Sequence, residues 1–227
     1  MRFDILTLFP DMCKCVLDES IIGRAQKSGA ITVSVKNIRD YSLDKHGRVD
    51  DYPYGGGRGM VMAVQPILSA LESVTQKDVR PYVVYMSPRG SVFNQTKAKE
   101  LSEKGRLIVL CGHYEGVDER IIEEIVDEEI SIGDFVLTGG EVPCCILVDA
   151  VARLCDGVLA DAECHEKESF SDGLLEYPQY TRPYDFMGRI VPDVLISGHH
   201  ANIEKWRHEK SMELTKERRP DLIKAKD

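Results

Sequence analysis

Residues 132–143 read Ile132-Gly133-Asp134-Phe135-Val136-Leu137-Thr138-Gly139-Gly140-Glu141-Val142-Pro143, and they run into a segment with helical spacing. The glycines let the backbone approach a ligand closely, and the apolar residues between them can line a pocket. The stretch is neither the G-x-G-x-x-G fingerprint nor a phosphate-binding loop that ends in Gly-Lys-Ser/Thr. It therefore predicts a loop that holds something flat and adenine-like through main-chain groups, without phosphate contacts.

Outward from this loop, short β-rich runs alternate with helical patterns. The expected strands are Phe3–Leu8, Ile31–Val35, Tyr82–Met86, Leu107–Cys111 and Glu129–Ile132. The expected helices are Asp11–Lys27, Pro66–Val74, Gln95–Lys104, Asp118–Ile125 and Glu141–Leu154. This alternation predicts an α/β fold with a mostly parallel sheet and helices on both of its faces.

The last three expected strands each end in a loop that contains glycine. Ser87-Pro88-Arg89-Gly90 follows the first of them, Gly112-His113-Tyr114-Glu115-Gly116 the second, and residues 133–140 the third. In open parallel sheets, ligands bind outside the carboxyl ends of the strands. Ordinary turn chemistry explains any one of these loops, but the three together predict one shared pocket.

Length and charge narrow the class of protein. The 227 residues allow one sizeable core, or a core with a small appendage, and the net charge of -9 argues against a globally basic nucleic-acid binder. The segment 204–227 has a net charge of opposite sign, because its eight basic and six acidic residues give +2. No apolar run reaches the ~20 residues of a membrane helix. Asp4 interrupts the apolar start, which favours a first strand over a signal peptide.

The seven cysteines are odd in number and include no C-x-x-C pair. Most lie in apolar segments, which favours buried free thiols in a reducing cytoplasm. A zinc site built from Cys164, His165 and the His199-His200 pair is an alternative, but its spacing matches no familiar ligand pattern.

Two polar stretches interrupt the alternation. Residues 41–59 mix tyrosine with basic side chains, which suits contact with RNA through stacking and phosphate binding. The charged stretch 161–173 is typical of an interdomain linker. We therefore expect a domain at 1–159, a linker at 160–172 and a C-terminal domain at 173–227.

Five long motifs resemble one family, the bacterial tRNA (guanine-37-N1)-methyltransferases (TrmD). They are Pro53–Met62, Gly112–Arg120, Ile132–Glu141, Gly173–Pro183 and Ser197–His200. The resemblance runs from residue 1 to about 222, and the chain stops earlier than family members with a further C-terminal helix. It implies a SPOUT-type domain whose parallel sheet ends in a deep trefoil knot, a rare exception to chain topology. It also implies a small, mainly helical C-terminal domain that binds the tRNA anticodon stem-loop, and a cytoplasmic homodimer with shared active sites.

The same resemblance implies S-adenosyl-L-methionine as the cofactor. Its expected site comprises Tyr85, Ser87, Pro88, Gly112, Tyr114, Glu115, Ile132, Gly133, Phe135, Leu137, Gly139, Gly140 and Pro143. Glycines supply main-chain groups for the adenine edge, and Ile132, Leu137 and Pro143 supply apolar faces, so the residue types fit.

The implied reaction methylates N1 of guanosine 37 in tRNA that also carries G36. N1 must lose a proton, so a general base is required. The resemblance implies Glu168 in this role, where the family more often has Asp, with Asp172 and Glu166 as competing carboxylates. Arg153 is implied as the cation that stabilises the charge growing on O6.

Residues implied in RNA binding are Asp50, Gly59, Asp172, Ser197, Gly198, His199, His200, Trp206 and Arg207. The family also implies Mg2+ for transfer, but the sequence identifies no metal site, and carboxylates such as Glu168 are only candidates. Arg58 departs from the family pattern, either as an added phosphate contact or as a neutral variant.

Three other interpretations stay open. The chain could be a SPOUT methyltransferase for another RNA, although the motifs at 173–183 and 197–200 lie outside the generic cofactor domain. It could be a non-catalytic RNA-binding protein, which would need neither the glycine loop nor Arg153 and Glu168 together. It could be a cysteine hydrolase that uses Cys111 and His113, although no third group to orient the histidine is evident.

Overall fold

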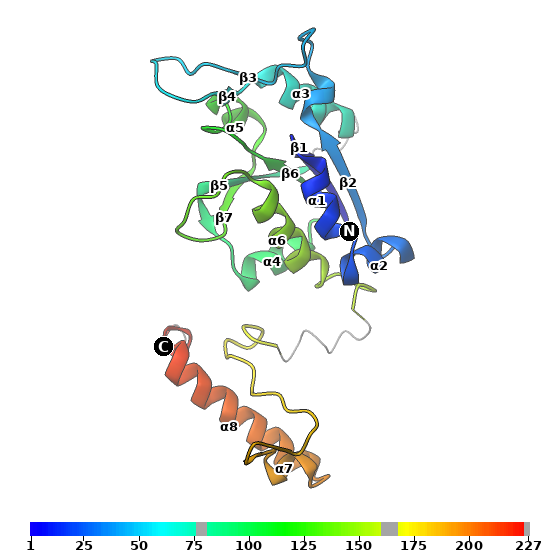
Figure 1. The fold of residues 1–227 in the computed structure, drawn as a ribbon, viewed down its shortest axis with the longest axis vertical. Coiled ribbons are helices and arrows are strands. Elements are labelled where there is room, and N and C mark those ends of the chain that lie inside the picture. Colours follow the sequence, from blue (N-terminus) through cyan, green and yellow to red (C-terminus); the bar gives the residue numbers. More distant parts are fainter. Residues whose placement is uncertain (76–80, 160–167, 225–227) are drawn as a thin grey trace. The chain divides into compact units, whose positions relative to one another are not determined.

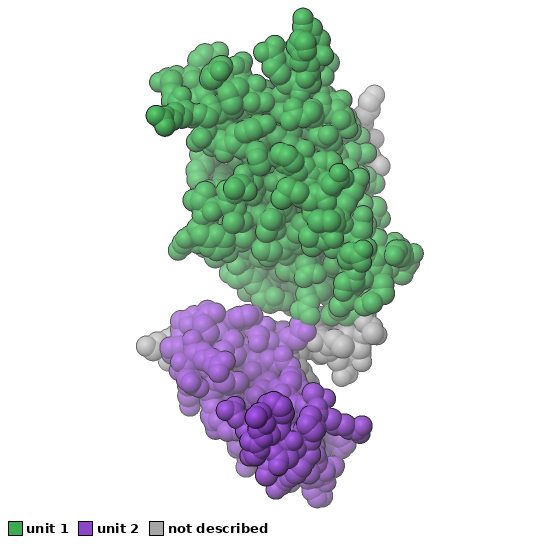
Figure 2. All heavy atoms as spheres, in the orientation of Figure 1, with its two compact units in different colours: residues 1–160 green, residues 161–227 purple. Residues whose placement is uncertain are grey.

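The computed structural model describes residues 1–75, 81–159 and 168–224. It divides the chain into two compact units, Met1–Ala160 and Asp161–Asp227 (Figures 1 and 2). Among the described residues, no helix has both the length and the apolar character needed to cross a bilayer.

The first unit is built on a five-stranded sheet. Its strands are β1 (Arg2–Thr7), β2 (Thr32–Asn37), β5 (Tyr82–Val92), β6 (Arg106–Cys111) and β7 (Glu128–Ser131), in the order β2-β1-β6-β5-β7. Every pairing between neighbours is parallel. Each of the five strands overlaps a run expected from the sequence, and the prediction of an α/β fold with a parallel sheet is confirmed.

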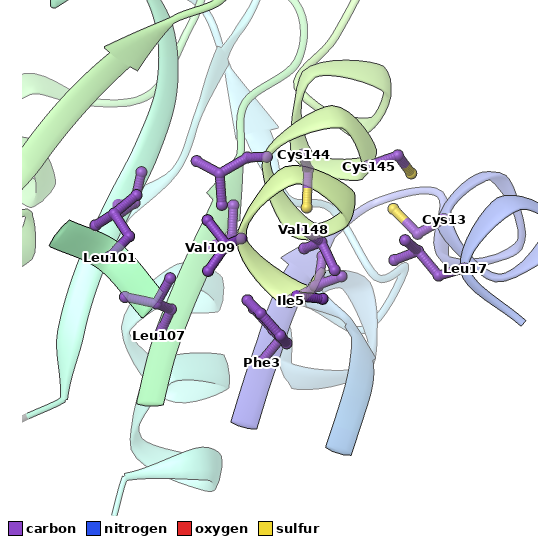
Figure 3. Close-up of a cluster of buried hydrophobic side chains, with 14 of the residues drawn as sticks. Phe3, Ile5, Cys13, Leu17, Leu101, Leu107, Val109, Cys144, Cys145 and Val148 are labelled. Atoms are coloured by element: carbon purple, nitrogen blue, oxygen red, sulfur yellow. The ribbon is translucent and has the colours of Figure 1, made fainter. Parts of the chain in front are cut away.

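Helices cover both faces of this sheet. Successive side chains along each strand point to opposite faces, so both faces present apolar residues that helices bury. Val84 and Met86 of β5 pack into one buried cluster, while Val83 and Tyr85 pack into the other. The first cluster, drawn in Figure 3, also receives the helices α1 (Pro10–Leu17), α2 (Ser20–Ser28), α4 (Gln95–Ser102) and α6 (Glu141–Ala152). The second receives the 3-10 helix η1 (Ile38–Tyr41) together with α3 (Val64–Val74) and α5 (Glu119–Ile125).

Two local predictions were wrong. The segment 11–27 forms two helices instead of one, because the chain turns at Asp18 and Ser20 has a left-handed φ of 52°. Gly23 then approaches the Asp18 carbonyl so closely that a Cβ atom would overlap it. The residues 87–90 are not a free loop but lie inside β5, which continues to Val92 past an irregularity in its pairing with β7 between Met86 and Ser91.

The polar stretch 41–59 contains one short strand, β3 (Asp50–Asp51), which pairs antiparallel with β4 (Val61–Met62). The second unit contains the hairpin β8 (Asp185–Phe186) and β9 (Arg189–Ile190), followed by α7 (Asp193–Ile196), α8 (His200–Arg218) and α9 (Asp221–Lys224). The segment before the hairpin is tied to α8, since Leu175 N donates to Thr215 Oγ1 at 2.8 Å.

Candidate functional site

A pocket of about 240 Å³ opens beside the middle of β5 and the ends of β6 and β7. Its walls come from residues 85–88 of β5, the end of β7 and the loops that follow β6 and β7. The lining residues are Tyr85, Ser87, Pro88, Gly112, His113, Tyr114, Glu115, Gly116, Ile130, Ser131, Ile132, Phe135, Val136, Leu137, Thr138, Gly139 and Pro143. The structure therefore brings together the three segments that the sequence predicted to share one site, and the first of them lies within β5 rather than after it.

Eleven of the thirteen expected cofactor residues line this pocket; Gly133 and Gly140 do not. Gly133 has a φ of 145°, and a Cβ atom there would lie 2.7 Å from the Phe135 ring. At Gly140 a Cβ atom would lie 2.7 Å from the Cα of Cys111. Both glycines thus shape the loop from behind its lining surface.

The loops after β6 and β7 are joined by main-chain contacts. Gly140 N donates to Gly112 O at 2.8 Å, and His113 and Gly139 form an isolated antiparallel bridge. A Cβ atom at Gly112 would lie 2.7 Å from the Tyr85 hydroxyl. Glycine is required where these loops and Tyr85 meet because a larger residue would push them apart.

Tyr85 is a buried tyrosine in the lining of the pocket. Burial raises its pKa above the ordinary value, and the negative charge of Glu129 adds to this effect. The hydroxyl is therefore neutral at physiological pH and offers the pocket a fixed polar group within an apolar surface.

The stretch before β4 is attached to the pocket loop 112–116. Glu115 N donates to Met60 O at 3.0 Å, and Met62 N donates to Gly116 O at 2.9 Å. A Cβ atom at Gly59 would overlap the Glu115 carboxylate. Gly59, expected to contact substrate, therefore packs against Glu115, expected to contact cofactor.

Six lining residues were not among the thirteen expected to contact the cofactor: His113, Gly116, Ile130, Ser131, Val136 and Thr138. His113 is the most informative of them, because its Nδ1 is buried without a hydrogen-bond partner. The ring of Phe9 packs on it, with 4.8 Å between ring centroids. The signal available in the sequence was its position inside a loop whose other members were already assigned to the site.

Other expected site residues are not among the residues that line this pocket. Arg153 is half-buried at the C-terminal cap of α6, and Asp50 lies in β3 opposite Met62. In the second unit, Glu168 and Asp172 flank a turn in which Ser171 N donates to Glu168 O at 3.2 Å. Asp172 also accepts a hydrogen bond from Leu174 N at 3.0 Å. Glu166 lies outside the described residues.

The motif Ser197-Gly198-His199-His200 is exposed and leads into α8. Cys164 and His165, the other half of the conceivable zinc site, lie outside the described residues. His199 and His200 are exposed at the start of α8, and the zinc alternative is untested.

Trp206 and Arg207 line a second pocket of about 190 Å³ within the second unit. Its wall is aromatic: Arg207 lies over the Tyr177 ring at 4.8 Å, and Tyr180 packs on Trp206 with 6.2 Å between centroids. Arg207 Nε is buried without a hydrogen-bond partner. Its Nη1 donates to Glu204 Oε1 at 2.7 Å, so the pocket combines stacking surfaces with a guanidinium that has one unpaired donor.

The hydrolase interpretation is wrong. Cys111 is completely buried, and its side chain belongs to the core cluster on the face of α1 and α6, whereas His113 lines the pocket. Burial raises the pKa of the Cys111 thiol well above its ordinary value. A reactive cysteine needs an accessible thiolate, which Cys111 does not provide.

The chain is similar to known proteins over its whole length. A family model described as tRNA (Guanine-1)-methyltransferase TrmD matches residues 1–225. A protein named tRNA (guanine-N(1)-)-methyltransferase from Ruminiclostridium cellulolyticum is 60% identical, covering 98% of this chain and 96% of its own length. A protein of the same name from Lachnospira eligens is 57% identical, covering 98% of this chain and 94% of its own length. Another, from Clostridioides difficile, is 55% identical, covering 99% of this chain and 98% of its own length. This chain therefore belongs to the tRNA (guanine-1)-methyltransferase TrmD family, of the SPOUT class.

Proposed function

We propose that this protein is a tRNA (guanine-N1)-methyltransferase that moves the methyl group of S-adenosyl-L-methionine to N1 of guanosine 37. The observation that carries the proposal is the convergence of β5 and the loops after β6 and β7 on one pocket, lined by eleven residues expected to contact this cofactor. Family membership supports the coarser activity, methylation of guanine in tRNA.

The pocket suits the adenosine part of the cofactor. Ile132, Leu137 and Pro143 offer apolar surface, and the glycines at 112 and 139 expose main-chain groups to the ligand. The described lining contains no lysine or arginine, which agrees with a nucleoside that carries no phosphate. When bound, the cofactor supplies an electrophilic methyl group on a sulfonium; the protein supplies orientation and proton transfer.

The proton on N1 of guanine leaves to a carboxylate, and Glu168 is the proposed base. A free glutamate has a pKa of ~4.3, so complete deprotonation before transfer would be strongly uphill. Proton loss concerted with methyl transfer removes this difficulty. Asp172, four residues along the chain, is the competing carboxylate.

Arg153 is proposed to stabilise the negative charge that develops on O6 during the same step. Its guanidinium stays charged at any physiological pH and can donate two parallel hydrogen bonds. A fixed cation of this kind lowers the barrier because its interaction is stronger in the transition state than in the ground state.

The anticodon stem-loop is the proposed RNA partner. The second unit supplies Tyr177, Tyr180 and Trp206 for base stacking, and Arg207 has a buried donor without a partner. In the first unit, Tyr52 and Tyr54 are 78% and 99% exposed in the stretch beside Asp50 and Gly59. The exposed Ser197–His200 motif is proposed to complete the RNA surface.

A second copy of the chain is the proposed partner of an apolar groove of about 450 Å³ formed by α1, α2 and α6. Met12, Val16, Ile21, Val142 and Ile146 line it, and each is between 37% and 53% exposed. Contiguous apolar surface of this kind is typical of protein interfaces. In the proposed homodimer, Glu168 of one subunit serves the pocket of the other, and the pocket loops form the family's trefoil knot.

The Mg2+ requirement stays a prediction. Among the residues that the structure describes, the one group able to hold a metal consists of three cysteine thiols. Mg2+ prefers oxygen ligands in octahedral geometry, so this group does not fit it. The proposed proton and methyl transfers do not involve Mg2+.

Transfer of a labelled methyl group to tRNA transcripts tests this function. With S-adenosyl-L-methionine as donor, a transcript carrying G36 and G37 should be labelled, and the same transcript with A36 should not. Equal labelling of both would contradict the proposed specificity. Labelling of ribosomal RNA but of neither tRNA would favour another RNA substrate. Binding of RNA without any transfer would favour a non-catalytic RNA-binding protein.

A further inference from the structure

Three cysteines from distant parts of the chain meet in the core of the first unit. They are Cys13 on α1, Cys111 at the end of β6 and Cys144 on α6, and their Sγ atoms all lie within 4.8 Å of one another. Each is 0% exposed. Figure 3 shows Cys13 and Cys144 among the apolar side chains that join α1 and α6 to the sheet.

The three thiols also interact with one another directly. The Cys111 side chain forms hydrogen bonds with Cys13 and with Cys144. Cys144 in turn forms one with Cys13. The cluster is therefore a set of mutually hydrogen-bonded sulfurs inside an apolar core.

Two of the cysteines also lie near the N-terminus of a helix, where negative charge is favoured. Cys13 is the fourth residue of α1, and Cys144 is the fourth residue of α6. The first turn of a helix carries partial positive charge, which stabilises a nearby thiolate. This placement opposes the cost of holding several thiolates away from water.

We propose that Cys13, Cys111 and Cys144 form a binding site for a soft, thiophilic d10 cation, Zn2+ or Cu+. A metal–sulfur bond of ~2.3 Å in a trigonal arrangement puts the sulfurs about 4.0 Å apart, so small side-chain movements suffice. Binding breaks three S–H bonds, forms three metal–sulfur bonds and releases three protons to solvent. Soft thiolate ligands select these ions over Mg2+ and Ca2+.

The coordination number separates the two ions. Three thiolates complete a trigonal site for Cu+, whereas Zn2+ prefers four ligands. Cys145, whose thiol is hydrogen-bonded to Cys13 but lies outside the group of three, would have to move to become the fourth donor. The site lies directly behind the pocket, because Cys111 precedes the lining residue Gly112 and Cys144 follows the lining residue Pro143. A bound cation would tie α1 to that wall.

Metal retention by the full chain tests the site. Reduced, metal-free protein is incubated with Zn2+, or anaerobically with Cu+, passed through gel filtration and analysed for metal. We expect about one ion per chain in the wild type, with a raised melting temperature. We expect at least a tenfold lower metal content in Cys111→Ala and Cys144→Ala. Loss of Zn2+ but not of Cu+ in Cys145→Ala identifies the four-coordinate form.

Matched controls replace cysteines other than the four proposed donors. Cys15→Ser, Cys155→Ser and Cys164→Ser should retain the ion as the wild type does. X-ray absorption of the loaded wild type needs no variant, and three or four sulfur neighbours at ~2.3 Å support the proposal. The proposal is overturned if the wild type retains no ion, if Cys164→Ser alone loses it, or if the first coordination shell contains nitrogen and oxygen.

Discussion

Oε2 of Glu141 lies 3.9 Å from Nδ1 of His113, at the edge of the candidate pocket. Glu141 is buried, and its Oε1 accepts a hydrogen bond from Thr7 Oγ1 at 2.7 Å. A Cβ atom at Gly139 would lie 2.6 Å from Nδ1 of His113 and would overlap Oε2 of Glu141. The absence of a side chain at residue 139 therefore keeps the histidine and the buried carboxylate in their positions.

Gly139→Ala should weaken the binding of S-adenosyl-L-methionine. The added methyl group displaces His113 or Glu141 and moves the pocket loop, so we expect at least a tenfold higher Kd, or about 1.4 kcal/mol of binding free energy. Isothermal titration calorimetry measures the change. Unchanged affinity would show that the loop is not part of the cofactor site.

Gly105→Ala is the matched control for this variant. Gly105 has a φ of 72°, and nothing lies within 4 Å of a Cβ atom there. Its replacement should lower the free energy of unfolding by about 1 kcal/mol through backbone strain alone. Cofactor affinity in this control should equal that of the wild type.

Tyr85 should make the stability of the protein depend on alkaline pH. Burial raises its folded pKa above the unfolded value of ~10, so the folded state holds the proton more tightly. This contribution is fully present below pH 10 and is lost as the pH rises through the folded pKa.

Tyr85→Phe should therefore flatten the fall in the free energy of unfolding above pH 10, measured by urea denaturation. Near pH 8 the free energy of unfolding of the variant should be about 1 kcal/mol below that of the wild type, because the hydrogen bond from the Val117 backbone N–H disappears. Tyr54→Phe is the control, since Tyr54 is 99% exposed, and it should keep the wild-type slope. The same slope in all three proteins would refute the assignment to Tyr85.

Ile146→Glu should convert the proposed dimer into a monomer. Ile146 is 45% exposed on α6 in the apolar groove, and a charge there would be buried without a partner at the interface. Sedimentation equilibrium should give the mass of two chains for the wild type and of one for the variant. Leu43→Glu, at a site that is 84% exposed outside the groove, should remain dimeric. A monomeric wild type would count against shared active sites.

Much of the fold could be read from the sequence because hydrophobic runs bounded by turn residues are local signals. The five strands and their parallel pairing follow from such runs. The division of 11–27 into two helices could not be read, since it depends on the close approach of Gly23 to Asp18. The continuation of β5 through 87–92 likewise depends on its pairing with β7, a contact between distant segments.

The site was predictable where it consists of loops and less so where it depends on packing. Resemblance identified the glycines, and the pocket now gives physical reasons for several of them, such as the contact of Gly112 with Tyr85. The meeting of Cys13, Cys111 and Cys144 was hidden, because these residues are up to 131 positions apart in the chain.

Glu168→Gln and Arg153→Ala should each lower kcat by at least a hundredfold while changing the Kd of S-adenosyl-L-methionine less than twofold. The first removes the proton acceptor and the second removes the charge opposite O6, neither of which the cofactor contacts in the proposed mechanism. Single-turnover methylation and calorimetry measure the two quantities. Near-normal turnover in Glu168→Gln would shift the base to Asp172.

The product nucleoside tests the central claim most directly. Transfer RNA with G36 and G37 is methylated by the purified protein, cut into fragments, digested to nucleosides and analysed by mass spectrometry with chromatographic standards. We predict N1-methylguanosine, one per tRNA, in the fragment that contains position 37. A methyl group on another atom of guanine, on ribose, or in a fragment without position 37 would contradict this function.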